Sequence, residues 1–281
     1  MNKTFSIIEE IRVHHWIKNL IIFFPIFFGG AIFTSQNLFI SSLVFILFSF
    51  TASIVYLIND IKDVEEDRQH PSKKNRPLAS GQISNMEAYL LILFFFISDA
   101  LLSVYVYNYK IVLILIAYLI TNLLYTFYLK KIALWDIIFV SGMYLFRLYS
   151  GSAATDISVS GWLFTTVFFG SLILIISKRY CEIRNNQTRF VLKKYTPEFL
   201  HSLLLISLGI TITAFTTYSI NLGLLHMPSI VLFTLILFRY YYIVETESKG
   251  EKPEFMFFSD KQLFAMVVLF VSYSAFLVYV R

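Results

Sequence analysis

The chain has little cysteine and little charge for its length. Cys181 is the single cysteine among 281 residues, so an internal disulfide is excluded. Charged residues make up 15% of the chain and hydrophobic residues 57%, and the mean hydropathy is +0.69. Soluble domains carry about 25% charged residues. The composition therefore predicts a polytopic membrane protein.

Several other signals are missing. Stretch 1–19 is polar and amphipathic and lacks an apolar core before a small-residue cleavage site, so no cleavable signal peptide is expected. No internal repeat or low-complexity linker is found, which favours one domain over residues 1–281. Alternating hydrophobicity typical of a membrane barrel is also absent. A zinc site is not expected, because no histidines have ligand spacing; they are His14, His15, His70, His201 and His226.

Long apolar segments fill most of the chain. A helix needs about 20 mostly apolar residues to cross roughly 30 Å of hydrocarbon. Because backbone groups in lipid must bond internally, each segment is expected to be a helix. Pro25 and the Gly29-Gly30 pair would kink or shorten the first one. Nine spans are predicted, at about 17–35, 38–58, 87–106, 110–129, 133–153, 161–178, 199–220, 227–244 and 262–280.

The basic residues predict how these spans are oriented. Of the 23 lysines and arginines, only Lys110 and Arg281 fall in the loops of one side, and Arg147 lies inside a span. Since lysine and arginine mark cytoplasmic loops, we expect the N-terminus inside and the C-terminus outside the cell (plasma) membrane. The net charge of +5 lies in these loops, so no nucleic-acid partner is expected. The long charged loops at about 59–86, 179–198 and 245–261 place the chemistry at the cytoplasmic face.

The first of these loops begins with an acidic motif, NDIKDVEEDRQHPSKKNRPLASG, at residues 59–81. If the preceding helix continues, at about 100° per residue, four of its polar side chains share one arc of roughly 100°. They are Asn59, Asp60, Asp63 and Asp67, whereas Glu65 points elsewhere and Glu66 lies at the margin. Clustered carboxylates repel one another unless a counter-ion is present.

Magnesium would supply that counter-ion, because it prefers oxygen ligands and is usually held by one or two carboxylates plus substrate phosphates. Lys73, Lys74 and Arg76 follow the acids and could hold the same phosphates. A solvated acidic loop beside the membrane is the alternative. The motif therefore favours a magnesium-assisted phosphate site.

The second charged loop, SKRYCEIRNNQTRFVLKKYTPEF, is rich in basic residues. Lys178 and Glu182 are four residues apart, so an ordinary helix-surface ion pair would explain them. Topogenic charges and binding to anionic lipid are further explanations. On the same membrane face as the acidic motif, the loop would form a cationic wall for a substrate with several phosphates.

A few polar residues fall at membrane depth. Arg147 and Asp99 are costly there and lie at similar depths, so they could pair with each other or line a cavity. Asp136 follows Lys130 and Lys131 and could pair with them. The run from Arg12 to Asn19 suits an interfacial anchor.

These residues together resemble a known family. Asn59-Asp60-Ile-Lys-Asp63-Val-Glu-Glu-Asp67 after a span, then Asn75-Arg76-Pro77-Leu78-Ala-Ser-Gly81, is similar to the first aspartate-rich motif of the UbiA superfamily of intramembrane prenyltransferases. The resemblance covers essentially the whole chain. It implies an all-α integral membrane protein with nine transmembrane helices around a central cavity that opens to the cytoplasmic face.

The branch is indicated by what replaces the family's second aspartate-rich motif. After span six stand Lys178-Arg179-Tyr-Cys-Glu182, Arg189 and Lys193-Lys194-Tyr195. With Trp16-Ile-Lys18-Asn19, Tyr125 to Lys131, and Arg147-Leu-Tyr-Ser-Gly151 ahead of Ser160-Gly-Trp162, the chain resembles the decaprenyl-phosphate phosphoribosyltransferase branch. That branch implies magnesium-dependent transfer of a 5-phosphoribosyl group from phosphoribosyl diphosphate to a polyprenyl phosphate, for cell-wall arabinan precursors.

The resemblance also implies roles for individual residues. Asp60, Asp63 and Asp67 would be catalytic, and with Asn59 they would hold the metal. The residues implied in substrate binding are Lys18, Asn19, Asn59, Arg76, Tyr125, Lys130, Arg147, Lys178, Arg179, Glu182, Arg189 and Tyr195. Two alternatives stay open at this point: transfer of a prenyl group from its diphosphate to an aromatic acceptor, and a transporter with Arg147 and Asp99 in its pathway.

Overall fold

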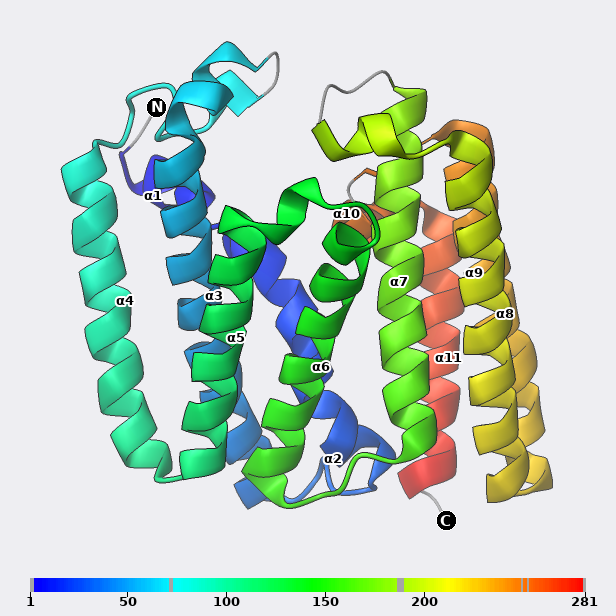
Figure 1. Cartoon of the computed structure of the whole chain (residues 1–281). Coiled ribbons are helices and arrows are strands. Elements are labelled where there is room, and N and C mark those ends of the chain that lie inside the picture. The colour runs from blue at the N-terminus through cyan, green and yellow to red at the C-terminus, as the bar shows by residue number, and fades with distance from the viewer. Residues whose placement is uncertain (1–2, 71–72, 186–189, 249, 252, 280–281) are drawn as a thin grey trace. The chain divides into compact units, whose positions relative to one another are not determined.

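The computed structural model describes residues 3–70, 73–185, 190–248, 250–251 and 253–279, and every regular element in these ranges is a helix (Figure 1). The predicted all-α class is therefore confirmed. The α-helices are α1 (Lys3–Glu10), α2 (Phe24–Phe28), α3 (Ser35–Gln69), α4 (Asn85–Val106), α5 (Tyr109–Phe127), α6 (Trp135–Thr155), α7 (Gly161–Arg184), α8 (Pro197–Leu222), α9 (Met227–Glu247), α10 (Pro253–Ser259) and α11 (Lys261–Tyr279). The 3-10 helices are η1 (Val13–Phe23), η2 (Lys73–Asn75), η3 (Leu129–Lys131), η4 (Phe190–Lys194) and η5 (Leu224–His226).

Eight helices in the described part of the chain are long and apolar enough to cross a membrane, namely α3 to α9 and α11. The chain is accordingly a multi-pass membrane protein, and these helices correspond to eight of the predicted spans. The segment expected at 17–35 is different, because η1 and the short helix α2 occupy it. Pro25 has no backbone N–H to donate, and Gly30 has φ +70° just beyond α2. The total of nine, the central cavity and the orientation stay predictions.

The chain divides into two compact units, which are described separately; the single-domain assignment stays a prediction. Unit 1 contains the residues up to Ile26, Ile32–Thr126 and Phe146–Asp156. Helix α3 runs for 35 residues through the acidic motif, as predicted, and α4 packs along it (Figure 1). A buried apolar cluster joins α3 and α4 to the residue after α1 and to the segment between α3 and α4; its members are Ile11, Ile54, Leu57, Leu78, Ile83, Ala88 and Phe95. This core holds the N-terminal segment against the motif.

Unit 2 contains Phe27–Ala31, Phe127–Leu145 and the chain from Ile157 onward, so the boundary falls within α6. Helices α7 and α8 pack along each other, and α9 packs against both α8 and α11 (Figure 1). Rings of Phe215, Phe233 and Phe270 meet at the centre of the α8–α9–α11 group, with centroid distances of 4.2 and 5.6 Å from Phe215. The hydroxyl of Tyr279 donates to the carbonyl of Phe27 at 2.8 Å, which ties α11 to α2.

Within unit 1, Gly151 allows a close approach of two backbones. A Cβ at this position of α6 would overlap the carbonyl oxygen of Ile22 in η1. Ile22 itself is fully buried. Small residues allow backbones to meet closely in membrane proteins. Gly151 therefore brings η1 against α6, one turn beyond Arg147.

Candidate functional site

The acidic motif lies at the end of α3, where its side chains divide as predicted. Asp60 and Asp67 are buried, at 3% and 2% exposure, and Asn59 and Asp63 are half-buried. Glu65 and Glu66 are exposed to solvent. The helical continuation therefore turns Asp60 and Asp67 inward, leaves Asp63 half-buried and places Glu65 and Glu66 outside.

Two arginines contact these buried carboxylates. Nη2 of Arg12 lies 2.6 Å from each oxygen of Asp60. Nη1 of Arg76 donates to Asp60 Oδ1 at 2.9 Å and to Asp67 Oδ2 at 2.5 Å, so one nitrogen joins the two carboxylates. Nζ of Lys73 is 3.5 Å from Asp67. We call Asp60, Asp67, Arg12 and Arg76 the carboxylate cluster.

Arg12 was not among the predicted site residues. It lies 48 positions before Asp60 at the turn between α1 and η1, and its φ of 55° is in the left-handed region. Its guanidinium also lies over the ring of Tyr56, 4.9 Å from the centroid. Non-glycine residues in this conformation are uncommon and gather at functional sites, where the surroundings hold them. No periodicity in the sequence signals this contact.

Glu10 lies beside the cluster and was also missed. Its side chain is 2% exposed, Oε2 accepts from the Leu78 amide at 3.1 Å, and Oε1 has no hydrogen-bond partner among the described residues. Burial and then the charge of Asp60 raise the pKa of Glu10 from 4.5 to about 7, against the opposing effect of Arg12 and Arg76. Glu10 therefore gains its proton more readily in the folded protein than in the unfolded chain.

This shift predicts a pH-dependent stability. Protonated Glu10 is favoured in the folded state, so stability falls as pH rises from 4.5 through about 7, by a total on the order of 3 kcal/mol. We expect Glu10→Gln to remove most of this fall, measured as melting temperature from pH 5 to 8 without divalent metal. Glu9→Gln on the same helix changes an exposed residue and should keep the fall. Equal slopes in both variants would contradict the assignment.

The carboxylate oxygens of the cluster are ligands that fit a hard divalent cation. Arg12 Nη2 touches both oxygens of one carboxylate, and Arg76 Nη1 touches two carboxylates, so cationic atoms already hold positions among the carboxylate oxygens. Magnesium takes such oxygens at about 2.0–2.1 Å and usually needs one or two carboxylates. Within the described ranges, no group of three or more Asp, Glu, His or Cys side chains converges. Substrate oxygens and Asn59 would have to complete the ligand set.

A second polar group in unit 1 surrounds Arg147, which is 4% exposed. Its Nε donates to Asn19 Oδ1 at 2.7 Å and its Nη2 to Tyr118 at 3.3 Å, and it lies over the rings of Phe48 and Tyr118. The structure thus joins two predicted site residues, Asn19 and Arg147. The pairing of Arg147 with Asp99 is wrong, because Asp99 accepts from Thr51 at 2.9 Å and its other oxygen lacks a hydrogen-bond partner in the described residues.

In unit 2, three predicted substrate-binding residues, Arg179, Glu182 and Tyr195, form a polar group with Asp136. We call these four residues the Arg179 network. Arg179 donates to Asp136 at 2.9 Å and to Glu182 at 2.8 Å, and Tyr195 donates to Asp136 at 2.5 Å. All four are buried, with Asp136 at 0% exposure. Asp136 therefore pairs with Arg179 and Tyr195; the expected pairing with Lys130 and Lys131 is wrong.

The network also fixes nearby backbone. The Tyr195 hydroxyl accepts from the Leu134 amide at 2.6 Å, and Leu134 has a left-handed φ of 66°. Burial and then the hydrogen bond to Asp136 raise the pKa of Tyr195, so its hydroxyl keeps its proton and donates. The loop between α5 and α6 is thereby tied to the segment before α8.

The other predicted substrate-binding residues are placed as follows. Lys18 in η1 and Tyr125 in α5 are half-buried in unit 1. Lys130 in η3 and Lys178 in α7 are half-buried in unit 2. Arg189 lies outside the described residues.

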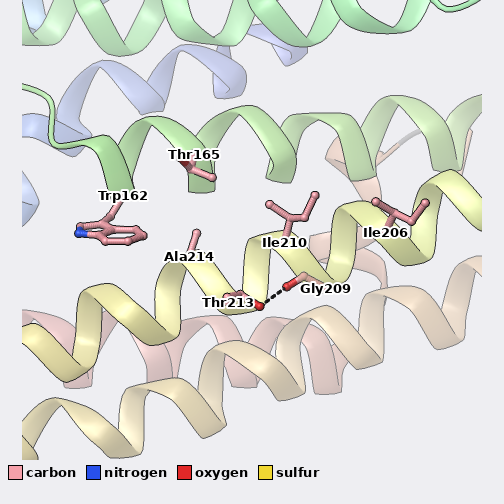
Figure 2. A pocket seen from close by; sticks show the side chains of 7 residues that line it. All are labelled: Trp162, Thr165, Ile206, Gly209, Ile210, Thr213 and Ala214. Carbon is pink, nitrogen blue, oxygen red and sulfur yellow. Dashed lines mark hydrogen bonds between the residues drawn. The ribbon is translucent and has the colours of Figure 1, made fainter.

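A groove of about 400 Å³ lies between α7 and α8 of unit 2 and is lined by apolar and small residues (Figure 2). Trp162 lies at one end and Ile206 at the other. The hydroxyls in its wall are used within their own helices, since Thr213 donates to Gly209 and Thr165 to Gly161, both at 2.8 Å. No charged side chain lines it. The groove thus lacks the groups that would bind a phosphate.

Comparison with known proteins agrees with this fold and motif. Residues 22–261 match the UbiA prenyltransferase family. The decaprenyl-phosphate phosphoribosyltransferase of Mycobacterium tuberculosis is 30% identical over 96% of this chain and 93% of its own length. That of Corynebacterium glutamicum is 30% identical over 95% and 84%. The structure of a UbiA homolog from Archaeoglobus fulgidus bound to GPP and Mg²⁺ has a TM-score of 0.73 at 18% identity, covering 97% of this chain and 99% of that one.

The fold and the carboxylate cluster define a multi-pass, all-helical membrane protein with an acidic motif at the end of a long helix. The chain belongs to the UbiA prenyltransferase family and is a transferase. The resemblance to the superfamily and to its decaprenyl-phosphate phosphoribosyltransferase-like branch is confirmed.

Proposed function

We propose that the protein transfers a 5-phosphoribosyl group from phosphoribosyl diphosphate to a polyprenyl phosphate, with magnesium, at the cytoplasmic face of the cell membrane. The observation that carries the proposal is the carboxylate cluster, in which buried Asp60 and Asp67 lie among basic side chains suited to a metal-bound diphosphate. The names of the curated relatives support the choice of donor and acceptor.

The chemistry needs positioning and charge stabilisation rather than a strong base. An ionised phosphate oxygen of the lipid attacks the anomeric carbon of the ribose, and the bond from that carbon to the diphosphate breaks, with the electron pair leaving on the diphosphate. Bound magnesium would neutralise the charge of the leaving diphosphate. Asp60 and Asp63, with Asn59 and Asp67 as ligands or their outer partners, would hold that ion.

Basic residues have the complementary role of binding phosphates. Arg76 donates to both carboxylates of the cluster, so its guanidinium lies beside the oxygens that would hold the metal. We assign Lys18, Arg147, Lys130 and Lys178 to phosphate binding as well, and Asn19 and Tyr125 to the support of the bound substrates. The charge pattern of the loops supports the cytoplasmic orientation.

The Arg179 network is assigned a different role. Two nitrogens of Arg179 donate to Asp136 and Glu182. The hydroxyl of Tyr195 donates to Asp136 and accepts from the Leu134 amide. We therefore propose that Arg179, Glu182 and Tyr195 position the loops around Lys130 and Lys178 and do not themselves grip the substrate. Arg189 keeps its proposed contact with substrate from the sequence pattern.

The activity is tested in purified protein with magnesium. One reaction holds a polyprenyl phosphate with labelled phosphoribosyl diphosphate, and a parallel one holds a labelled prenyl diphosphate with 4-hydroxybenzoate. We expect label to enter the lipid phase from the phosphoribosyl donor and to depend on added magnesium. Prenylated aromatic product alone would replace the proposed reaction by the aromatic prenyltransferase alternative.

A further inference from the structure

The carboxylate cluster carries enough positive charge to neutralise its own acids. Arg12, Arg76 and Lys73 contact Asp60 and Asp67, so three cationic groups face two buried carboxylates. The cluster therefore offers a free cation no surplus of negative charge.

Arg12 is built into this arrangement and is not a loose surface residue. Its side chain is 16% exposed, its nitrogen reaches both oxygens of Asp60, and Tyr56 covers its guanidinium. Its backbone carbonyl accepts from His15 and its amide donates to Glu9, which fixes the turn. A buried ion pair of this kind needs further partners to offset desolvation.

From this geometry we infer that Arg12 makes metal binding depend on the diphosphate. A lone Mg²⁺ ion would have to displace the Arg12 guanidinium from Asp60 and leave that cation without its carboxylate. A metal ion that arrives with a diphosphate brings phosphate oxygens to which Arg12 and Arg76 donate once they leave the carboxylates. The two guanidinium groups thus exchange one set of anionic partners for another, and no charge is left uncompensated.

The inference rests on the proposed function, since it assigns Arg12 to the diphosphate end of that same site. It goes further by giving the metal and the diphosphate a positive coupling that is carried by a residue outside the aspartate motif. Such coupling is reciprocal: each ligand raises the affinity for the other by the same factor, typically about 5- to 150-fold.

The test uses Mg²⁺ and inorganic pyrophosphate as probes, with the full-length protein in detergent and titration calorimetry. In the wild type, Mg²⁺ alone should bind weakly, and pyrophosphate should raise its affinity by a factor within the usual range of about 5 to 150. In Arg12→Gln, Mg²⁺ alone should bind more tightly, pyrophosphate should bind more weakly, and the coupling factor should drop to about 2 or less. The opposite signs of the two changes exclude a general loss of structure.

A matched control is Arg68→Gln on α3, because Arg68 is half-exposed and pairs with exposed Glu65 at 2.7 Å. It should keep the wild-type coupling. If Arg12→Gln does not fold, Arg12→Lys is used instead. It keeps the charge but replaces the planar guanidinium by a single ammonium nitrogen, so it should show reduced coupling. Unchanged coupling in the Arg12 variant that folds would overturn the inference and make Arg12 a structural counter-ion only.

The result is independent of which sugar or lipid is used. If Arg12→Gln loses the coupling as expected but the wild type shows no phosphoribosyl transfer, the proposed donor is rejected and the role of Arg12 is kept. Phosphoribosyl transfer together with unchanged coupling would reject the role of Arg12 and keep the proposed reaction.

Discussion

Asp60→Ala is expected to reduce phosphoribosyl transfer by a factor on the order of 100 to 1,000, the usual cost of removing one preorganised charge-stabilising group. Asp60 is the carboxylate at which both arginines of the cluster meet, and it is 3% exposed. Its loss removes a proposed metal ligand and also leaves Arg12 without its partner. The rate of label transfer at saturating donor, over a range of magnesium concentrations, measures the effect.

The matched control for Asp60→Ala is Glu65→Ala, five residues along the same helix. Glu65 is 74% exposed and pairs with Arg68 on the outer side. Glu65→Ala should retain nearly full activity, because Glu65 belongs to the same acidic run but faces away from the cluster. Equal losses in the two variants would show that the overall acidity of the loop matters, and not the inward-facing set.

Asp136→Asn is expected to destabilise the protein by about 3 kcal/mol, because removing one partner of a buried ion pair leaves the other charge uncompensated. Asp136 is fully buried, accepts from both Arg179 and Tyr195, and is the centre of the Arg179 network. The substitution keeps the shape of the side chain and removes only its charge. A drop in melting temperature on the order of 10 °C in detergent would be the corresponding measurement.

Asp156→Asn is the control with the same chemical change. Asp156 is 83% exposed, and Lys110 is 3.6 Å away. Exposed pairs contribute about 0 to 1 kcal/mol, so its melting temperature should stay close to that of the wild type. If Asp136→Asn were as stable as Asp156→Asn, the Arg179 network would not hold the loops of unit 2.

The long helices of the fold could be predicted from the sequence because the length of an apolar run decides whether a helix can cross a membrane. Eight spans were found from their apolar runs, and the continuation of α3 through the motif correctly separated Asp60 and Asp67 from Glu65. The 17–35 segment could not be predicted from hydropathy alone. There, η1 has 3-10 geometry and packs against α6 at Gly151, and neither feature is visible in a hydropathy pattern.

The site was predictable only where its residues are neighbours in sequence. The acids of the motif share one helical face, so their spacing was sufficient. Arg12 and Glu10 reach the cluster from a segment about 50 residues away, through contacts that no local pattern encodes. For Asp136, the nearby lysines suggested a local pair, whereas burial favoured Arg179, which lies 43 positions along the chain.

The close approach at Gly151 has a consequence for how the membrane interior of unit 1 is sealed. With no side chain on Gly151, the carbonyl of Ile22 rests on the backbone of α6, and this leaves no room for a lipid tail between them. Asn19 lies one turn before Ile22 in η1, and Arg147 lies one turn before Gly151 in α6. Gly151, which has no side chain, thus lets η1 come close enough to α6 for the Arg147 guanidinium to donate to Asn19, and these two polar groups bond to each other within the unit.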